Sequence, residues 1–418
     1  MKRNSLKKPV CYSGWRLVLF GLRFWFSLLR YALKPTKYPQ FSLRRTVKNI
    51  LSPGKKIGLK KIVRFHNRYY LSVLKAPHWP SAAFDRYAGL GGLNVHQAGT
   101  PQKKAVDFVI LGITRRCAYH CKHCYEAGNL SAQETVPVER WRQIVADLQR
   151  IGVGTIVFSG GEPLARFDDL VQLLESGDKA LSDFHLHTTG FGLTAQRARW
   201  LREAGLDAAG IGLDDYDPER LNRFRGHPDA HEHAVKAVEY FRQAGVFPYL
   251  NLCLTKPLMR DRRLYTFYRQ MEKIGVGAIQ IYEPKPVGRY AGIHPDELFS
   301  QADRTKTNRF FEDIQTNRKY KDFPKVTYVD YFERPERLGC QLAGMSHFYI
   351  DSVGQVKPCV FLSVSVGNIL QEELPVIFNR MRRTFPHPIY GECPAVALRR
   401  RAGATRLPAD LIEQEVSF

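Results

Sequence analysis

The chain has 418 residues, enough for two or three domains, and its 44% apolar and 25% charged residues are typical of a globular protein. Eight cysteines in this length exclude a disulfide scaffold, and six of them fall in two groups, which favours a reducing, cytosol-facing environment. The net charge of +23 is concentrated in residues 1–104, which hold 22 Lys and Arg against one acid, Asp85. Residues 105–418 are nearly neutral, so the basic character belongs to an N-terminal extension.

Residues 15–33 are predicted to form an amphipathic helix that ends before Pro35. Arg16, Arg23 and Arg30 recur every seven residues and so share one stripe. The broad apolar face beside this stripe consists of Trp15, Leu19, Leu22, Trp25, Phe26, Leu29 and Leu33. The arginines interrupt the apolar run too often for a transmembrane segment or a cleaved signal peptide. A basic stripe beside bulky aromatic residues suits an anionic membrane surface, with packing onto the catalytic domain or a mitochondrial transit sequence as alternatives.

A second basic segment, Lys55 to Lys75, is also expected to form an amphipathic helix. Lysines near an anionic leaflet contribute about 1 kcal/mol each, so the two segments together could hold the protein at the inner face of the membrane. RNA is the competing partner, because basic patches with aromatic residues also bind nucleic acid. We place the domains at 1–104 for this extension, 105–300 for a catalytic region, and 301–418 for a linker and a C-terminal domain.

Cys117, Cys121 and Cys124 are spaced four and then three residues apart, directly after the apolar run 108–113. Thiolates this close on a loop can converge on one metal centre, and they favour iron–sulfur clusters, zinc or copper(I). Three ligands also leave one coordination position free for chemistry. A zinc site that includes His120 or His123, although the spacing fits no zinc-finger pattern, and a disulfide between two of the cysteines are the alternatives.

The pattern Cys-x3-Cys-x2-Cys, with the aromatic residue His123 directly before the last cysteine, resembles the signature of the radical S-adenosylmethionine (SAM) superfamily. The resemblance implies a [4Fe–4S] cluster on these three cysteines, whose fourth iron holds the amino and carboxylate groups of SAM. It also implies an external one-electron reductant of the flavodoxin or ferredoxin type. Reduction then splits SAM into methionine and a 5′-deoxyadenosyl radical.

From residue 105 onward, strand-like and helix-like patterns alternate six times. The apolar runs are 108–113, 155–158, 184–188, 208–213, 247–254 and 278–282. The helical stretches between them are 138–151, 194–204, 230–244 and 261–274, and each is followed directly by glycine. This alternation predicts an α/β fold with parallel strands joined by right-handed crossovers. Six units match the partial (β/α)6 TIM-like barrel of the superfamily, in which chemistry lies at the carboxyl ends of the strands.

A glycine turn follows the second predicted strand of the barrel. Gly160, Gly161 and Glu162 resemble the family motif that meets the amino group of SAM. Glycine lets the backbone approach the cofactor closely, and a carboxylate suits an ammonium. After the third strand, Thr188 opens a turn that resembles the family's Thr-Asn-Gly near the ribose, but Thr189 replaces the Asn.

The fourth strand ends at another departure from the family pattern. Gly212 stands where the family usually has a serine that contacts the cofactor. Arg225, thirteen residues later, resembles the arginine of an Arg-Gly pair and is the expected bidentate partner of the cofactor carboxylate. The alternative interpretation is that Arg225 is an ordinary surface arginine.

The C-terminal region contains Cys340, Cys359 and Cys393. Residues 348–356 are predicted to form a hairpin whose far strand leads to Cys359, and a helix is predicted near 372–381. The spacing resembles the first half of SPASM and twitch domains, which implies one auxiliary [4Fe–4S] cluster. Val396 stands where a fourth cysteine would lie, so the fourth position comes from elsewhere or stays open to substrate. Cys253 is a candidate for it, and a buried core cysteine is the alternative.

Together these features predict a radical SAM enzyme that removes a hydrogen atom from a membrane-associated or lipid-linked substrate. A peptide maturase and an RNA-modifying enzyme are the alternatives, and an iron–sulfur carrier is disfavoured because it needs no Gly160–Glu162 motif. We expect the protein in the cytoplasm, peripheral at the inner face of the membrane.

Overall fold

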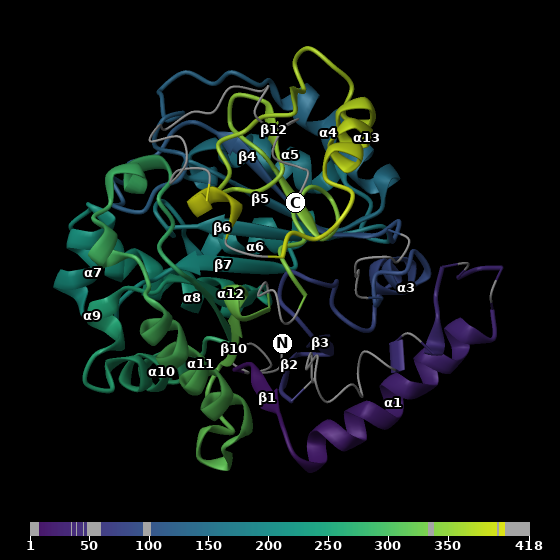
Figure 1. Ribbon diagram of the computed structural model, residues 1–418, viewed down its shortest axis with the longest axis horizontal. Coiled ribbons are helices and arrows are strands. Elements are labelled where there is room, and N and C mark those ends of the chain that lie inside the picture. The colour runs from purple at the N-terminus through teal and green to yellow at the C-terminus, as the bar shows by residue number, and fades with distance from the viewer. Residues whose placement is uncertain are drawn as a thin grey trace.

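The computed structural model describes residues 8–34, 36–38, 40–44, 46–47, 60–94, 102–332, 338–390 and 393–397. Its main element is a curved ten-stranded sheet in the order β10-β9-β8-β7-β6-β5-β4-β11-β12-β13 (Figure 1). The strands are β4 (Val106–Thr114), β5 (Val153–Gly160), β6 (Asp183–Thr188), β7 (Ala208–Gly212), β8 (Phe247–Cys253), β9 (Ala278–Tyr282), β10 (Lys325–Tyr328), β11 (His347–Ile350), β12 (Gln355–Lys357) and β13 (Gly367–Asn368).

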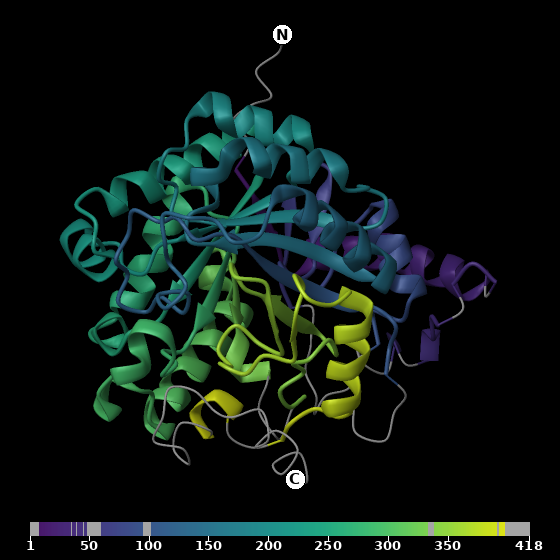
Figure 2. The same ribbon diagram turned by 90° about the horizontal axis from the view of Figure 1, so that it is seen from above.

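Strands β4 to β9 lie in chain order and pair in parallel, with helices on the outer side of the sheet (Figure 2). The helices are α4 (Val138–Ile151), α5 (Phe167–Ser176), α6 (Ala195–Ala204), α7 (Pro218–Arg225), α8 (Ala230–Ala244), α9 (Lys256–Met259), α10 (Arg263–Ile274), α11 (Gln301–Thr316), α12 (Val329–Phe332) and α13 (Leu374–Thr384). Short 3-10 helices span Pro163–Arg166, Gly288–Gly292, Pro295–Glu297 and Arg318–Tyr320. The predicted partial (β/α)6 barrel is therefore confirmed.

The helix ends follow the glycines of the sequence. Helices α4, α6, α8 and α10 each stop at a left-handed glycine: Gly152, Gly205, Gly245 and Gly275. Strand β10 was not anticipated by the sequence analysis. It adds a seventh parallel strand beside β9.

The C-terminal hairpin β11–β12 continues the barrel sheet. Strand β11 pairs in parallel with β4, in a register that places His347 opposite Phe108 and Ile350 opposite Leu111. The hairpin is also bound to the loop after Cys124, because the Tyr349 and Ser352 hydroxyls both donate to the Glu126 carboxylate. The turn between β11 and β12 is thereby placed at the carboxyl ends of the barrel strands, and β12 runs back toward their amino ends.

The N-terminal region forms its own antiparallel sheet of β1 (Val10–Tyr12), β2 (Ile62–Phe65) and β3 (Arg68–Tyr70). The helix predicted over residues 55–75 is therefore wrong for residues 62–70, and residues 55–59 lie outside the described part. The physical reason is tertiary packing: Val63, Phe65 and Tyr70 bury their side chains against the amino ends of the barrel strands. Tyr70 stacks on Phe247 at 4.0 Å between ring centroids.

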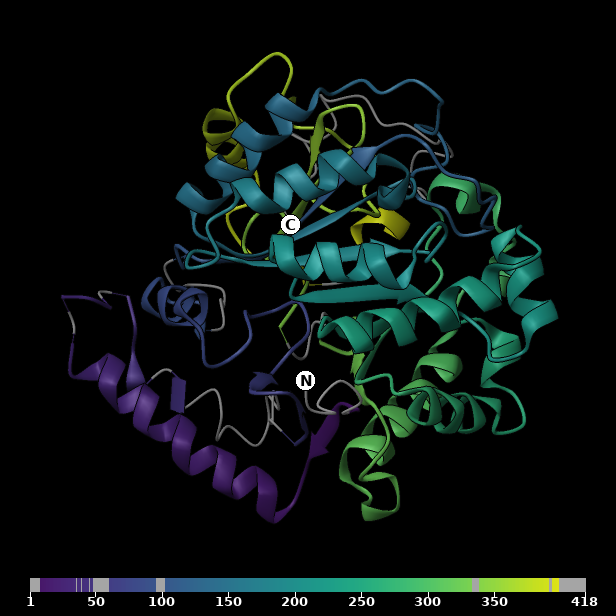
Figure 3. The ribbon, with the colours of Figure 1, turned by 180° about the vertical axis from the view of Figure 1, so that it is seen from behind.

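Helix α1 (Trp15–Ala32) confirms the helix predicted over residues 15–33 and runs along the edge of the molecule, beside α3 (Ala82–Gly89) (Figures 1 and 3). Phe20, Phe24, Leu28 and Tyr31 are buried against residues of the N-terminal region, among them Trp79 and Phe84. The opposite face is exposed and carries Trp15, Val18, Leu19, Leu22, Trp25, Phe26 and, just past the helix, Leu33. In the described part of the chain, no helix is both long and apolar enough to cross a membrane.

Candidate functional site

The cysteine loop, residues 115–125, follows β4 and is held by backbone hydrogen bonds from two other parts of the barrel. The amides of His120 and Lys122 donate to the carbonyls of Arg225 (3.2 Å) and Phe224 (3.0 Å) at the end of α7. The Arg289 amide donates to the Cys124 carbonyl at 2.9 Å. The loop is therefore fixed at the carboxyl edge of the sheet, where the barrel fold predicts chemistry.

The three thiols of the loop are suitable ligands for a centre that contains several metal ions. Cys117, Cys121 and Cys124 are free thiols, which excludes the disulfide between two of them. Burial raises the pKa of Cys117 to about 12 and that of Cys124 to about 11, so a positively charged centre is needed to keep them as thiolates.

The distances between the three sulfur atoms indicate whether the loop suits an iron–sulfur cluster or a single zinc ion. A zinc ion binds each thiolate at about 2.3 Å, which brings its ligand atoms within about 4 Å of one another. The three sulfur atoms of the loop do not all lie within 4.8 Å of one another. Thiolates that sit on separate irons of a cluster are spread more widely, so the loop fits a cluster better than zinc.

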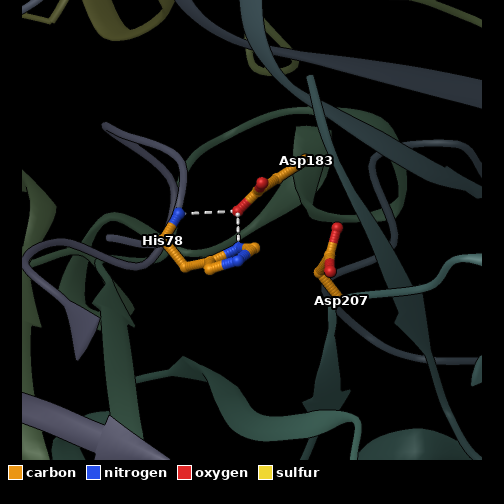
Figure 4. A group of neighbouring side chains, drawn as sticks. All are labelled: His78, Asp183 and Asp207. Carbon is orange, nitrogen blue, oxygen red and sulfur yellow. Dashed lines mark hydrogen bonds and ion pairs between the residues drawn. The ribbon is translucent and has the colours of Figure 1, made fainter. Parts of the chain in front are cut away.

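Among the described residues, one set of three ligand atoms does meet within 4.8 Å: His78, Asp183 and Asp207, at the amino ends of β6 and β7 (Figure 4). His78 donates to Asp183 from both its backbone amide (2.7 Å) and Nδ1 (2.8 Å). Burial alone would lower the pKa of His78, but the Asp183 carboxylate outweighs it and raises the pKa. Arg68 and Arg202 also pair with Asp207, at 3.3 and 3.4 Å, so this group is an ion-pair network that anchors the N-terminal region.

A cavity of about 250 Å³ lies inside the barrel, below the cysteine loop. Cys117, Cys121 and Cys124 line it, and so does Cys359 from the C-terminal region. Its wall includes side chains of the barrel interior and of the N-terminal region, among them Ser72, Leu74, Lys75, His187, Asn251, Gln280 and Tyr282. Cys359 of the second cysteine group, more than 200 residues away in sequence, thus lies at the same cavity as the loop cysteines.

Gly160 and Gly161 line this cavity and lie against the start of the cysteine loop. Gly160 has φ 117°, and a Cβ there would lie 2.6 Å from the Thr114 carbonyl oxygen. A Cβ on Gly161 would overlap with the Arg116 carbonyl. Both positions therefore require glycine, and they present backbone groups to a ligand in the cavity.

The Glu162 carboxylate is used within the protein. It accepts hydrogen bonds from Thr188 Oγ1 (2.7 Å), the Thr189 amide (2.7 Å) and Thr189 Oγ1 (2.5 Å). Glu162 is 1% exposed, and the cavity wall does not include it. The predicted contact to the cofactor amino group stays a prediction. Glu162 ties the ends of β5 and β6 together, and Thr189, the departure from the family pattern, is one of its donors.

Gly212, Asp214 and Arg225 form one unit at the end of β7. Arg225 Nε donates to Asp214 Oδ2 at 2.6 Å, and Asp214 Oδ1 accepts from the Cys253 amide at 2.8 Å. Burial opposes the charged form of Arg225, but the Asp214 carboxylate outweighs it and raises the pKa. A Cβ on Gly212 would overlap with the guanidinium. The missing serine is thereby explained, because Arg225 fills its space and faces the cavity.

His123 presents a neutral aromatic ring to the cavity. Burial lowers its pKa to about 4, and the ring stacks on Phe224 at 4.9 Å between centroids. Its Nδ1 is buried without a hydrogen-bond partner among the described residues. An unsatisfied buried polar atom of this kind is a natural contact for a bound ligand.

The second cysteine group is assembled around the β11–β12 hairpin. The amide and carbonyl of Cys340 bond to Ile389 (2.8 and 3.0 Å), and the Ala343 amide donates to the carbonyl of Pro358, next to Cys359 (3.0 Å). Cys340, Cys359 and Cys393 are half-buried. Cys253 is buried at the end of β8 but also lines the cavity, so its position is compatible with either predicted role.

Sequence reasoning missed Asp214 and Lys285 as site residues. Asp214 orients Arg225, and Lys285, which lines the cavity, is paired with Asp330. The available signal was position: Asp214 lies two residues after β7 and Lys285 three residues after β9, at the edge of the barrel where a buried charge needs a function or a partner.

Comparisons with known proteins agree with this geometry. The model of the radical SAM superfamily matches residues 111–260. The AdoMet-dependent heme synthase of Oleidesulfovibrio alaskensis is 26% identical over 72% of this chain and 83% of its own. The PqqA peptide cyclase of Streptomyces rochei is 26% identical over 66% of this chain and 76% of its own. The crystal structure of Streptococcus suis SuiB bound to precursor peptide SuiA superposes with a TM-score of 0.54 at 17% identity, over 66% of this chain and 65% of that one, which shows a shared fold.

Proposed function

We propose that this chain, a member of the radical SAM superfamily and an enzyme, removes a hydrogen atom from an organic substrate that binds between its two cysteine groups. The observation that carries the proposal is the shared cavity, because Cys359 lines the same space as Cys117, Cys121 and Cys124. A substrate there lies within reach of both groups. A lone iron–sulfur carrier has no need for such a cavity.

The residues fit two clusters, one on Cys117, Cys121 and Cys124 and an auxiliary one on Cys340, Cys359 and Cys393. When bound, the first cluster and SAM supply a 5′-deoxyadenosyl radical, and the auxiliary cluster supplies an acceptor for one electron or a binding site for substrate.

The protein residues orient the cofactor in this proposal. Arg225, held by Asp214, offers its outer N–H groups to the carboxylate of SAM. The backbone of Gly160 and Gly161 faces the amino group, and Glu162 keeps that turn in place by binding Thr188 and Thr189. The neutral ring of His123 packs beside the cofactor. The barrel around the cavity excludes water from the reactive carbon.

The cavity wall below the cysteine loop combines neutral polar side chains with charged ones, since Lys75, Glu283 and Lys285 also line it. Burial lowers the pKa of His187 to about 3 and that of His347 to about 4, so both rings are neutral. Asn251 and Gln280 add amides. Amide and imidazole side chains form hydrogen bonds with the N–H and O–H groups of a bound molecule. The relatives named heme synthase and peptide cyclase supply two substrate classes to test, a tetrapyrrole and a peptide.

The test uses anaerobically reconstituted protein with SAM, a chemical reductant, and the lipid, peptide, tetrapyrrole and RNA fractions of cells that lack the gene. We expect one fraction to raise 5′-deoxyadenosine formation at least about tenfold over the rate without substrate. Substrate labelled with deuterium should then transfer deuterium to that product. SAM that stays intact in every arm contradicts the proposed function, whereas the identity of the active fraction selects the substrate class.

We also propose that α1 holds the enzyme at an anionic membrane surface, which places it near a membrane-associated or lipid-linked substrate. The exposed residues Trp15, Leu22 and Phe26 are 68%, 57% and 71% accessible. On a helical wheel the exposed apolar residues lie opposite the docked face of Phe20 and Phe24, and the arginine stripe lies between them. An apolar face with a basic flank is typical of helices that lie in the membrane interface.

Vesicle sedimentation measures this association. The wild-type protein should sediment with anionic vesicles, less with neutral ones, and high salt should weaken binding only in part, since salt screens charges but not apolar burial. Replacing Trp25 and Phe26 by Ser should abolish the salt-resistant part, and Arg16→Gln with Arg23→Gln should abolish the preference for anionic lipid. Trp200→Ser on α6, which removes a 48% exposed aromatic residue, is the control. Equal sedimentation of all variants contradicts membrane binding by α1.

A further inference from the structure

We propose that residues 70–78 close the amino end of the barrel, and that Leu74 selects the substrate group that lies farthest from the cysteine loop. We call residues 70–78 the plug loop. The inference rests on the proposed function, because it assigns a specificity-determining residue to the substrate of that reaction. The substrate group that fits beside Leu74 is apolar, an alkyl or aryl group.

The plug loop is held in place by contacts at its base. Tyr69 and Trp79, which flank the loop, exchange two backbone hydrogen bonds of 2.7 and 2.9 Å. His78, the last residue of the loop, donates to Asp183 at the amino end of β6 from its backbone amide (2.7 Å) and from Nδ1 (2.8 Å) (Figure 4). The loop is therefore fixed both to the N-terminal region and to the barrel, without a contribution from substrate.

The middle of the plug loop enters the hydrophobic core at the amino ends of the barrel strands. Val73 is fully buried and Leu74 is 3% exposed, and both belong to one cluster with Ile110 and Tyr249. The two side chains differ in one respect, because Leu74 lines the cavity, whereas Val73 is not part of its wall. Leu74 is thus the apolar residue with which the plug loop meets the cavity.

The cavity extends along the barrel, and Leu74 lies at its amino end. Phe108, near the start of β4, and Cys117, beyond the end of the same strand, both line the cavity. A strand rises about 3.3 Å per residue, so the six residues from Phe108 to Thr114 span about 20 Å. Leu74 shares its cluster with Phe108 and Ile110, not with the loop cysteines. A substrate that extends from the cysteine loop to the amino end therefore places its last group against Leu74.

The wall around Leu74 is apolar with a polar border. Phe108 and Val360 belong to the same hydrophobic cluster and also line the cavity. Lys75 and His347, which lies opposite Phe108 on β11, form the polar border. An apolar group at this position is stabilised by burial, and one methylene more or less in such a pocket changes selectivity by about 10- to 200-fold. The size of residue 74 should therefore decide which substrates fit.

The experiment compares substrate use by variants of residue 74, and its probe is the cell fraction that stimulates 5′-deoxyadenosine formation. Leu74→Trp fills the amino end of the cavity, so the KM for that fraction should rise at least about tenfold, with a smaller change in kcat. Leu74→Ala enlarges this end, so larger homologues in the same fraction should also be modified, as mass spectrometry would detect. Val73→Ala is the matched control, because it also shortens a buried side chain of the plug loop, and it should keep the wild-type KM and product masses.

Xenon, which binds to apolar cavities, gives a second readout that needs no turnover. Xenon NMR of the reconstituted protein should show weaker binding to Leu74→Trp and stronger binding to Leu74→Ala than to the wild type.

Several results would overturn the role of Leu74 and leave the proposed function intact, because SAM would still be cleaved. They are a wild-type KM or unchanged xenon binding in Leu74→Trp, and an equal rise of KM in Val73→Ala. A KM that rises in Lys75→Gln but not in Leu74→Trp would assign this end of the cavity to an anionic group and also overturn it. SAM that the wild type leaves intact would instead contradict the proposed function. Leu74→Phe repeats the test if tryptophan impairs folding.

Discussion

Replacing Cys117, Cys121 and Cys124 by alanine is expected to abolish reductive cleavage of SAM. Reconstituted wild-type protein should bind about eight irons, and this variant should keep about four, because each [4Fe–4S] cluster depends on its thiolates. The measurements are iron content and 5′-deoxyadenosine formation under anaerobic conditions. Full iron content in the triple variant would show that the loop is not a cluster site.

The second cysteine group should behave differently. The variant with Cys340, Cys359 and Cys393 changed to alanine should also lose about four irons, yet it should still cleave SAM. Its substrate turnover should stop, because the group that shares the cavity is missing. Cys11→Ala is the control, since this thiol lies on β1 and donates to the Phe323 carbonyl, away from the cavity. Full turnover without the C-terminal cysteines would make the second group structural.

The parallel strands of the barrel could be predicted because burial on both faces leaves continuous apolar runs in the sequence. The glycines at positions 152, 205, 245 and 275 marked the helix ends for a local reason, the left-handed backbone there. Residues 62–70 were not predicted correctly, because their apolar and basic residues follow neither a strict two-residue alternation nor a clear helical period. Their contacts with Phe247 and Tyr249, almost 200 residues away, decide for strands.

In the candidate site, too, local features could be predicted from the sequence, whereas contacts between distant residues could not. The spacing of the three loop cysteines is local, so the sequence alone indicated a shared centre. The partner of Glu162 is more distant, since Thr189 follows the neighbouring strand β6, whereas Arg225 and its partner Asp214 both follow β7 and are eleven residues apart. The motif therefore predicts that the Glu162 carboxylate matters. Its hydrogen bonds to Thr188 and Thr189, which connect the ends of β5 and β6, are visible only in the structure.

Helix α1 packs on the N-terminal region with one face, and membrane association of its other face stays a proposal. Because most of its circumference is apolar, periodicity could not separate a docked face from an exposed one. The structure buries Phe20 and Phe24 against Trp79, with ring centroids 5.4 and 5.6 Å away, and leaves Trp25 and Phe26 accessible. Docking orients the helix, and the exposed face remains for a partner.

Replacing Gly212 by serine restores the residue usual in the superfamily, yet it is expected to weaken SAM binding at least about tenfold, or about 1.4 kcal/mol. A Cβ at this position overlaps with the Arg225 guanidinium, which is 7% exposed and tied to Asp214 at 2.6 Å. The guanidinium can move only by giving up this buried ion pair, and breaking such a pair is costly. Calorimetry with SAM measures the effect.

Two further variants make the cause specific. Arg225→Ala alone should also weaken SAM binding, but adding Gly212→Ser to it should cost little more, because the overlapping side chain is gone. Gly21→Ser on α1, where a Cβ meets nothing within 4 Å, is the matched control for the substitution itself and should bind SAM normally. If Gly212→Ser binds SAM as tightly as the wild type, the serine has taken over the cofactor contact, and Arg225 neither fills that space nor holds the carboxylate.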